Sequence, residues 1–337
     1  MVAWTHGITN KNTLHDHVYY PIRAQFALGA QLACCARDKA VEAIKAAHQH
    51  GEDASCPAFG PTGSIRYDAR SYSLRGPEQV SLNTLHGRVR GILVVGSFQR
   101  QALVDSTWEI GGAELICRRT TWYLHITQSR PAPAPVATFS TIGCDLGIVN
   151  LLTTDDGTVF KGVAVRRIRE KRFKHRRRLQ HRGTRNAKRR LKKNAHTEQR
   201  FQKDVNHCIS KALVTKAVAE QKALRLEELT HIRQRTEATV RRSQRRQHSS
   251  WAFRQLRMFI TYKALHAGIP VILVNPRDTS RRCFQCGYAD KANRKNQATF
   301  HCQNPACAHT AAADVNAAQN IAFWAEVSQP IASPLRR

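Results

Sequence analysis

The chain has few acidic residues and no long run of apolar residues. Its 337 residues include 24 Asp and Glu against 54 Lys and Arg, which gives a formal net charge of +30. No apolar run reaches the roughly 18 residues that a membrane-spanning helix requires. The first residues, MVAWTHGITNKN, lack the basic and apolar segments of a secretory signal. We therefore expect a soluble protein that stays where it is made, in the cytoplasm or at the nucleoid of a prokaryote.

The excess of positive charge is concentrated in the second part of the chain. Residues 1–140 contain 14 basic and 10 acidic residues, whereas residues 141–337 contain 40 and 14. A polyanion is the natural partner of such a chain, and nucleic acid is the commonest one. A membrane surface is the weaker alternative, because no face rich in Trp or Phe accompanies the basic residues.

The densest basic stretch lies between Lys161 and Arg200, with 18 Lys and Arg and 2 acidic residues. Like charges three or four residues apart on a helix repel one another unless something neutralises them. Phosphates do so, and each phosphate contact makes binding more dependent on salt. We interpret this stretch as a nucleic-acid contact; the alternative is a solubilising surface.

The length and a hydrophobic content of 42% predict one large globular domain or two ordinary ones. Residues 14–48 carry apolar residues at helical spacing, and residues 64–127 alternate in the manner of antiparallel strands. The sequence RPAPAP, from Arg130 to Pro135, is typical of a stiff linker. A first domain is therefore expected at 1–130, followed by a linker at 131–136.

The segment Ala137–Asp156 is apolar enough to form a buried strand and the start of its hairpin partner. Asp145 lies in its middle, flanked by Gly143 and Gly147. An ionised carboxylate in a buried strand costs on the order of several kcal/mol unless something compensates it. A divalent cation compensates it, and the glycines leave room for an anionic ligand. The alternative is an aspartate that caps a turn at the end of the strand.

Two more acidic residues lie at the edges of predicted elements. Glu227 lies in the short apolar segment KALRLEELTHI, and Asp314 lies in the first turns of the helix predicted for AAADVNAAQNIAFWAEV. A carboxylate at a helix start also suits the helix dipole, which is the alternative role for Asp314. If the three carboxylates converge, they can hold two Mg²⁺ about 4 Å apart, with Mn²⁺ as a substitute. Such a pair clamps the attacking and leaving oxygens in phosphodiester cleavage.

Ten cysteines are present, and four of them have metal-ligand spacing. Cys283 and Cys286 form one pair, Cys302 and Cys307 form the second, and 15 residues separate the pairs. This pattern predicts one structural Zn²⁺ held by four thiolates in a ribbon, with His309 as the alternative to Cys307. The remaining six are expected to be reduced, buried small residues: Cys34, Cys35, Cys56, Cys117, Cys144 and Cys208.

Taken together, these motifs resemble the TnpB proteins that insertion sequences encode, compact RNA-guided DNA nucleases similar to the ancestors of type V CRISPR effectors. The resemblance covers residues 137–325 with ordered motifs and continues more weakly through 14–130. Family members usually open with a basic strand that completes a barrel, and residues 1–12 do not match it. The segments that carry the resemblance are IGCDLGIVN, LRLEELTHIR, SWAFRQLRMFITYKALHAGIPVILVNPRDTSRRCFQCG and FHCQNPACAHTAAADVNAAQNIA.

The resemblance implies an α/β fold with an RNase H-like, RuvC-type nuclease domain and an inserted zinc ribbon. An α+β region of recognition helices and a wedge-type β-barrel would precede it. The nuclease domain would comprise 137–276 and 310–327, and the ribbon 277–309. By motif, Asp145, Glu227 and Asp314 fall at the three catalytic acids.

The leading hypothesis is an Mg²⁺-dependent endonuclease that cuts double-stranded DNA selected by pairing with a bound guide RNA. Lys and Arg of 161–200 and 233–246 would hold nucleic-acid backbones. Alternatives are a cleavage-deficient DNA-binding regulator, RNA-guided or unguided, an RNA-processing nuclease with the same acids, and a type V CRISPR effector. No membrane partner is expected.

Overall fold

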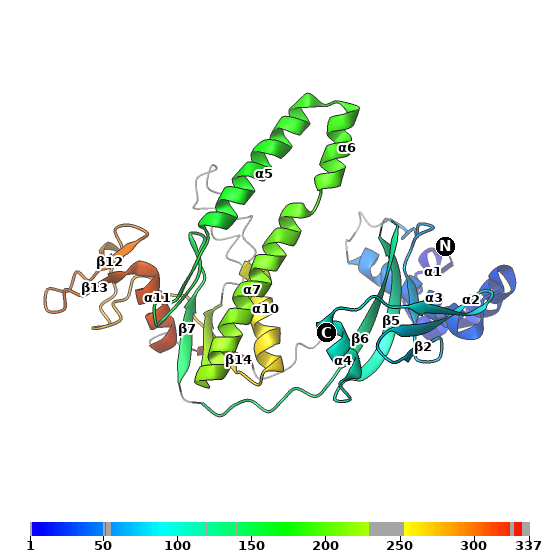
Figure 1. Cartoon of the computed structure of the whole chain (residues 1–337), viewed down its shortest axis with the longest axis horizontal. Coiled ribbons are helices and arrows are strands. Elements are labelled where there is room, and N and C mark those ends of the chain that lie inside the picture. The colour runs from blue at the N-terminus through cyan, green and yellow to red at the C-terminus, as the bar shows by residue number, and fades with distance from the viewer. Residues whose placement is uncertain are drawn as a thin grey trace. The chain divides into compact units, whose positions relative to one another are not determined.

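The structure is a computed structural model that describes residues 2–49, 51, 55–118, 120–138, 140–228, 253–323 and the backbone of 327–331. The chain divides into two compact units, Met1–Pro131 and Ala132–Arg337 (Figure 1). The predicted basic segment 233–246 lies outside the described residues. Within the described part, no helix is long and apolar enough to cross a bilayer.

The first unit begins with three helices, α1 (Val2–Thr5), α2 (Lys11–Phe26) and α3 (Ala30–His48). The sequence predicted one helical region over 14–48, and this is wrong at the centre. Ala27 adopts a left-handed conformation with φ of 51°, which ends α2, and Gly29 precedes the first turn of α3. The side chain of Asn10 accepts a hydrogen bond from the backbone of Asn12 and caps the start of α2.

Two three-stranded sheets follow, as the alternation in residues 64–127 predicts. One has the order β1-β5-β6, formed by β1 (Ile65–Tyr67), β5 (Glu109–Arg118) and β6 (Thr121–Ser129). The other has the order β2-β3-β4, formed by β2 (Tyr72–Arg75), β3 (Gln79–Thr84) and β4 (Gly87–Ile92), and α4 (Ser97–Val104) comes after it. The two sheets and α3 share a small apolar core, formed by Leu32, Tyr67, Tyr72, Val80 and Ala113.

The second unit is built on a six-stranded mixed sheet with the order β14-β11-β10-β7-β8-β9. The three central strands β11, β10 and β7 are parallel; β14 pairs antiparallel with β11, β8 with β7, and β9 with β8. The edge strand β14 was not predicted from the sequence. The bounds are β7 (Thr141–Asp145), β8 (Asn150–Thr154), β9 (Val159–Lys161), β10 (Ala223–Glu227), β11 (Val271–Val274) and β14 (Val327–Ile331).

Helices cover both faces of this sheet. On one face, α7 (Thr197–Glu220) and α10 (Phe253–His266) pack on the main apolar core, and on the other α11 (Ala313–Phe323) packs on β7 (Figure 1). Because side chains alternate along a strand, Ile142 and Cys144 of β7 face the main core, whereas Gly143 and Asp145 face α11. The same alternation places Leu226 of β10 in the core and turns its neighbour Glu227 toward the α11 face.

Gly143 allows α11 to approach the sheet closely. A Cβ atom at this position would overlap the carbonyl oxygen of Ala318 and would lie 2.6 Å from the backbone nitrogen of Ala322. The end of α11 is held to the same strands, because the Thr141 hydroxyl and the Arg225 guanidinium both donate to the carbonyl oxygen of Ala322. The close packing brings the helix that carries Asp314 onto the strand that carries Asp145.

The basic stretch forms an arm of helices that extends away from the sheet (Figure 1). It consists of α5 (Val163–Arg182), α6 (Arg185–Asn194) and the first turns of α7. Only Val165 and Leu179 are buried in α5, and only Ala187 is buried in α6. An ion pair of 3.3 Å between Arg169 and Glu198 ties α5 to α7, while the basic residues of α6 are exposed.

Candidate functional site

The structure places the three sequence-predicted carboxylates at one edge of the central sheet. Asp145 ends β7, Glu227 ends β10, and Asp314 lies in the first turn of α11. Strands β7 and β10 are parallel neighbours in which Cys144 pairs with Leu226, so Asp145 and Glu227 are the next residues of the two strands. The charges of Glu227 and Asp314 both act on Asp145. Residues that are distant in the sequence therefore meet at this edge.

Burial makes Asp145 and Glu227 reluctant to ionise, and neighbouring negative charges add to this effect at Asp145. Removal from water raises the pKa of Asp145 to about 8, with further contributions from the negative charges of Glu227 and Asp314. Burial also raises the pKa of Glu227, while the Thr279 hydroxyl and the Arg294 guanidinium oppose that rise. A bound cation would relieve the same penalty, because it stabilises the ionised carboxylates.

Asp314 has two polar partners that the sequence did not reveal. The Asn150 side chain, at the start of β8, donates to Oδ2 at 2.8 Å, and the Arg294 guanidinium donates to Oδ1 at 2.9 Å. Arg294 also lowers the pKa of Asp145 through its charge. It lies in a loop between the two cysteine pairs, where no periodicity marks it, so only its position in space identifies it as part of the site.

The structure also distinguishes the two adjacent glutamates at the end of β10, Glu227 in the strand and Glu228 directly after it. Glu228 forms an ion pair of 2.6 Å with Arg257 of α10, away from the carboxylate cluster. Glu227 accepts a hydrogen bond from the hydroxyl of Thr279, a buried residue that follows β11. Glu227 is therefore the glutamate that lies with Asp145, and Thr279 is a contact that the sequence did not predict.

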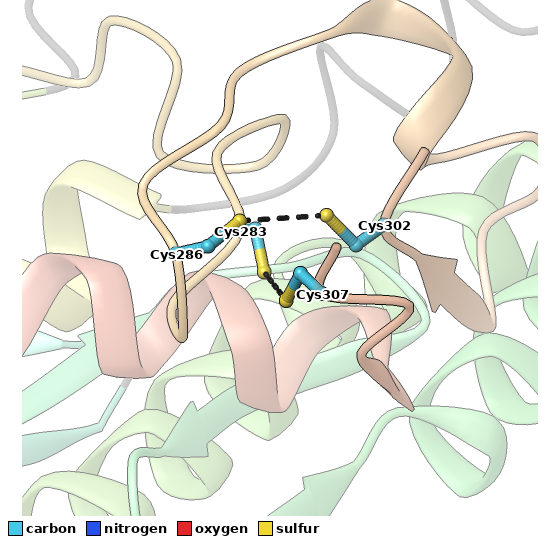
Figure 2. Close-up of side chains that lie close together, drawn as sticks. All are labelled: Cys283, Cys286, Cys302 and Cys307. Atoms are coloured by element: carbon cyan, nitrogen blue, oxygen red, sulfur yellow. Dashed lines mark hydrogen bonds between the residues drawn. The ribbon is translucent and has the colours of Figure 1, made fainter. Parts of the chain in front are cut away.

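The four cysteines form a compact cluster (Figure 2). Their sulfur atoms all lie within 4.8 Å of one another. Sγ of Cys283 is 3.8 Å from Sγ of Cys307, and Sγ of Cys286 is 3.6 Å from Sγ of Cys302. A tetrahedron of sulfurs with metal–sulfur bonds of about 2.3 Å has edges of about 3.8 Å, so this donor set fits a tetrahedral, thiophilic ion.

The cluster is held by two short hairpins. Backbone hydrogen bonds run from Cys283 to Tyr288 and from Cys302 to the carbonyl of His309, and strands β12 (Thr299–His301) and β13 (Thr310–Ala312) pair beside them. A hydrogen bond from the backbone of Tyr288 lowers the pKa of Cys286 to about 7, whereas burial raises the pKa of Cys302, so the protein alone favours the thiolate at only the first of these two. The side chain of His309 is not part of the cluster, so Cys307 and not His309 completes the set.

Among the described residues, the cysteines are the one group of three or more His, Cys, Asp or Glu side chains whose ligand atoms lie close enough together to hold an ion. In the structure the three carboxylates do not form such a group: Asp314 is engaged by Asn150 and Arg294, and Glu227 by Thr279. As a donor set, three carboxylates at the end of parallel strands fit a hard cation such as Mg²⁺. The other six cysteines do not share one environment, and the expectation that all of them are buried is wrong for two: Cys35 and Cys144 are buried, whereas Cys56 and Cys208 are exposed.

Two segments of the chain match known protein families. Residues 124–232 match the family model described as a probable transposase, and residues 253–321 match the model "Cas12f1-like, TNB domain". A "Putative RNA-guided DNA endonuclease InsQ" of Escherichia coli K12 is 32% identical over 219 residues, 59% of this chain and 53% of that protein. A "TnpB-like protein MJ0751" of Methanocaldococcus jannaschii is 36% identical over 116 residues, 34% of this chain and 40% of that protein.

Further matches come from CRISPR-associated proteins. A "CRISPR-associated endodeoxyribonuclease Cas12f1" of Sulfoacidibacillus thermotolerans is 39% identical over 124 residues, 36% of this chain and 27% of that protein. The chain thus matches about a quarter to a half of the length of these curated relatives. The fold matches a chain of a cryo-EM structure of a Cas12f1–sgRNA–target DNA complex with a TM-score of 0.63 and 14% identity, over 96% of this chain and 77% of that one. The resemblance to the TnpB family that the motifs indicate is therefore confirmed, and the matched regions contain all three carboxylates and all four cysteines.

Proposed function

We propose that this protein is an RNA-guided, Mg²⁺-dependent DNA endonuclease of the TnpB type. The observation that carries the proposal is the cluster of Asp145, Glu227 and Asp314, whose burial and repulsion raise the pKa of Asp145 to about 8. Such a cluster lowers the stability of the fold unless cations bind to it, and carboxylates with perturbed pKa values are concentrated at functional sites. The printed names of the relatives, an RNA-guided DNA endonuclease and CRISPR-associated endodeoxyribonucleases, support the same activity.

In this proposal each part of the second unit has a role. The mixed sheet with its helices is a RuvC-type, RNase H-like nuclease domain over 137–276 and 310–327, and residues 277–309 form a ribbon around one structural Zn²⁺. The donor set of four thiolates matches zinc in number and in sulfur spacing. The first unit, 1–130, would supply recognition helices and a wedge-type barrel built on its two sheets, and residues 131–136 would be the linker.

The chemistry depends on what the chain's own residues hold in place. Asp145, Glu227 and Asp314 would bind two Mg²⁺, which when bound activate water and stabilise the charge that develops on a cleaved phosphodiester. Asn150 and Arg294 orient Asp314 through its two oxygens. The Arg294 guanidinium also adds positive charge where a phosphate would lie, because it contacts the carboxylate cluster directly.

The proposed partners are a guide RNA and double-stranded target DNA. The exposed cations of α5 and α6 would bind phosphates, and base pairing with the RNA would select the sequence. A discrete RNA species that co-purifies with the protein and ends in the flank of its own gene would support guidance. Heterogeneous RNA that is released at moderate salt would instead indicate general polyanion binding.

The replacement Asp145→Ala tests the activity. We expect the purified RNA complex to cut a matching DNA duplex in Mg²⁺, and the variant to bind RNA with unchanged affinity but to leave the DNA intact. Metal-dependent cutting by Asp145→Ala would exclude this site. A wild-type complex that binds target DNA without cutting it would favour a DNA-binding regulator, and cutting of labelled RNA instead of DNA would favour an RNA-processing nuclease. Genome context would distinguish the insertion-sequence protein from a CRISPR effector.

A further inference from the structure

One short segment connects the carboxylate cluster to the cysteine cluster. It runs from Thr279 to Cys283 and follows β11. At its first residue, the buried Thr279 hydroxyl donates to Glu227, with the carbonyl oxygen of Pro276 3.0 Å away. At its last residue, the fully buried Cys283 contributes one sulfur atom to the four-cysteine set. Whatever fixes this segment therefore acts on both sites.

Two asparagines of α11 hold the segment. Nδ2 of Asn320 donates to the carbonyl oxygens of Thr279 at 2.9 Å and of Arg282 at 2.6 Å. Asn316 donates to the same Arg282 carbonyl at 2.9 Å and accepts from the backbone of Phe284 at 3.0 Å. Positions four apart lie on one face of a helix, so both side chains reach the same segment. Their helix also carries Asp314.

Both asparagines are buried at positions where an apolar side chain could fill the same space, which indicates that their hydrogen bonds have a role of their own. Asn316 and Asn320 are 0% and 1% exposed. Oδ1 of Asn320 is buried and accepts no hydrogen bond from any described residue. An unpaired buried acceptor is destabilising, so an apolar side chain of similar shape would avoid a penalty that the asparagine incurs. What the asparagine provides is its two donated bonds to the segment.

We propose that Thr279 is a positioning residue for Glu227, and that Asn320 fixes Thr279 relative to the cysteine cluster. Through this connection, an ordered cysteine cluster sets the affinity of the carboxylates for divalent cations. The inference rests on the proposed role of Glu227 as an Mg²⁺ ligand. The hydroxyl of Thr279 restrains one carboxylate oxygen of Glu227, and this leaves the other free for a cation. The cysteine cluster thereby acts on a site to which it contributes no ligand.

The test measures Mn²⁺ binding to the full-length protein directly, by the electron paramagnetic resonance signal of free Mn²⁺. The cysteine cluster is loaded with Co²⁺, whose absorption reports a tetrahedral thiolate site. Thr279→Val removes the hydroxyl and keeps the shape, Thr279→Ser keeps the hydroxyl, and Asn320→Leu removes the bonds to the segment. The matched control is Asn206→Leu, because Asn206 of α7 is also fully buried with an unpaired Oδ1 but lies on the opposite face of the sheet.

We expect Thr279→Val and Asn320→Leu to weaken Mn²⁺ binding about 10-fold, as is typical when a residue that orients a metal ligand is removed. The Co²⁺ spectrum should stay unchanged, Thr279→Ser should bind Mn²⁺ like the wild type, and so should Asn206→Leu. Wild-type affinity in both Thr279→Val and Asn320→Leu overturns the inference and leaves the proposed function standing. Wild-type protein that binds no Mn²⁺, or binds it equally well after Asp145→Asn, overturns the carboxylate site and the inference together.

Discussion

The replacement Asp145→Asn should make the protein more stable while removing the proposed cleavage activity. Asparagine has nearly the same shape as aspartate but carries no charge, so it removes the repulsion from Glu227 and Asp314. The pKa of Asp145 rises from 3.8 to about 8 in the folded chain. At about 1.36 kcal/mol per pKa unit, the rise sets an upper limit of about 6 kcal/mol on the penalty of the ionised carboxylate. Part of it is shared with the neighbouring acids, so we expect a gain of about 2–3 kcal/mol.

The gain should depend on pH with a definite sign. The folded-state pKa of Asp145 lies above its unfolded value, so the native state holds a proton that the unfolded state has released. The stability that this proton contributes is fully present below about pH 4 and is lost as the pH rises through about 8. Wild-type stability should fall over that range, and the advantage of Asp145→Asn should grow and then level off.

Thermal unfolding in magnesium-free buffer measures this effect. For a unit of about 200 residues, 2–3 kcal/mol corresponds to a rise in Tm of about 4–12 °C near pH 8.5. Strong chelators are left out, because they would also remove an ion from the cysteines. The control is the same measurement in saturating Mg²⁺, which neutralises the wild-type carboxylates and should abolish or reverse the difference. Equal Tm values at pH 8.5 without Mg²⁺, or a gain that shrinks as the pH rises, would refute the reasoning.

Three other predictions follow from the packing, the cysteine cluster and the arm. Gly143→Ala should destabilise the second unit by about 1–3 kcal/mol or more, because its Cβ overlaps the backbone of α11; an unchanged Tm would contradict the close approach. Cys302→Ser should lose the bound zinc in a colorimetric metal assay while far-UV circular dichroism keeps the signal of the sheet and helices, and retained zinc would contradict a four-thiolate site. Replacing Lys188, Arg189, Lys192 and Lys193 of α6 by Ala should reduce the slope of log affinity for duplex DNA against log salt by up to about 3.6, with Tm unchanged, and an unaltered slope would remove α6 from the interface.

The sequence determined the features that depend on local pattern. Short apolar segments located the strands that hold Asp145 and Glu227, because a strand that is covered on both faces is apolar along its length. The cysteine spacing identified the four-thiolate set, since each pair lies within one short turn. The linker composition indicated a boundary near the division between the two units at Pro131 and Ala132.

The tertiary structure decided everything that depends on contacts between distant segments. It turned Glu227 toward α11 and Glu228 toward Arg257, added β14 beside β11, and placed Arg294 and Asn150 on Asp314. It also showed that Asn316 and Asn320 hold the segment between the two clusters. Asn150, Arg294, Asn316 and Asn320 do not stand out by periodicity or composition. Each acquires its role from a polar partner tens of residues or more away, and such pairings are fixed only when the helices pack on the sheet.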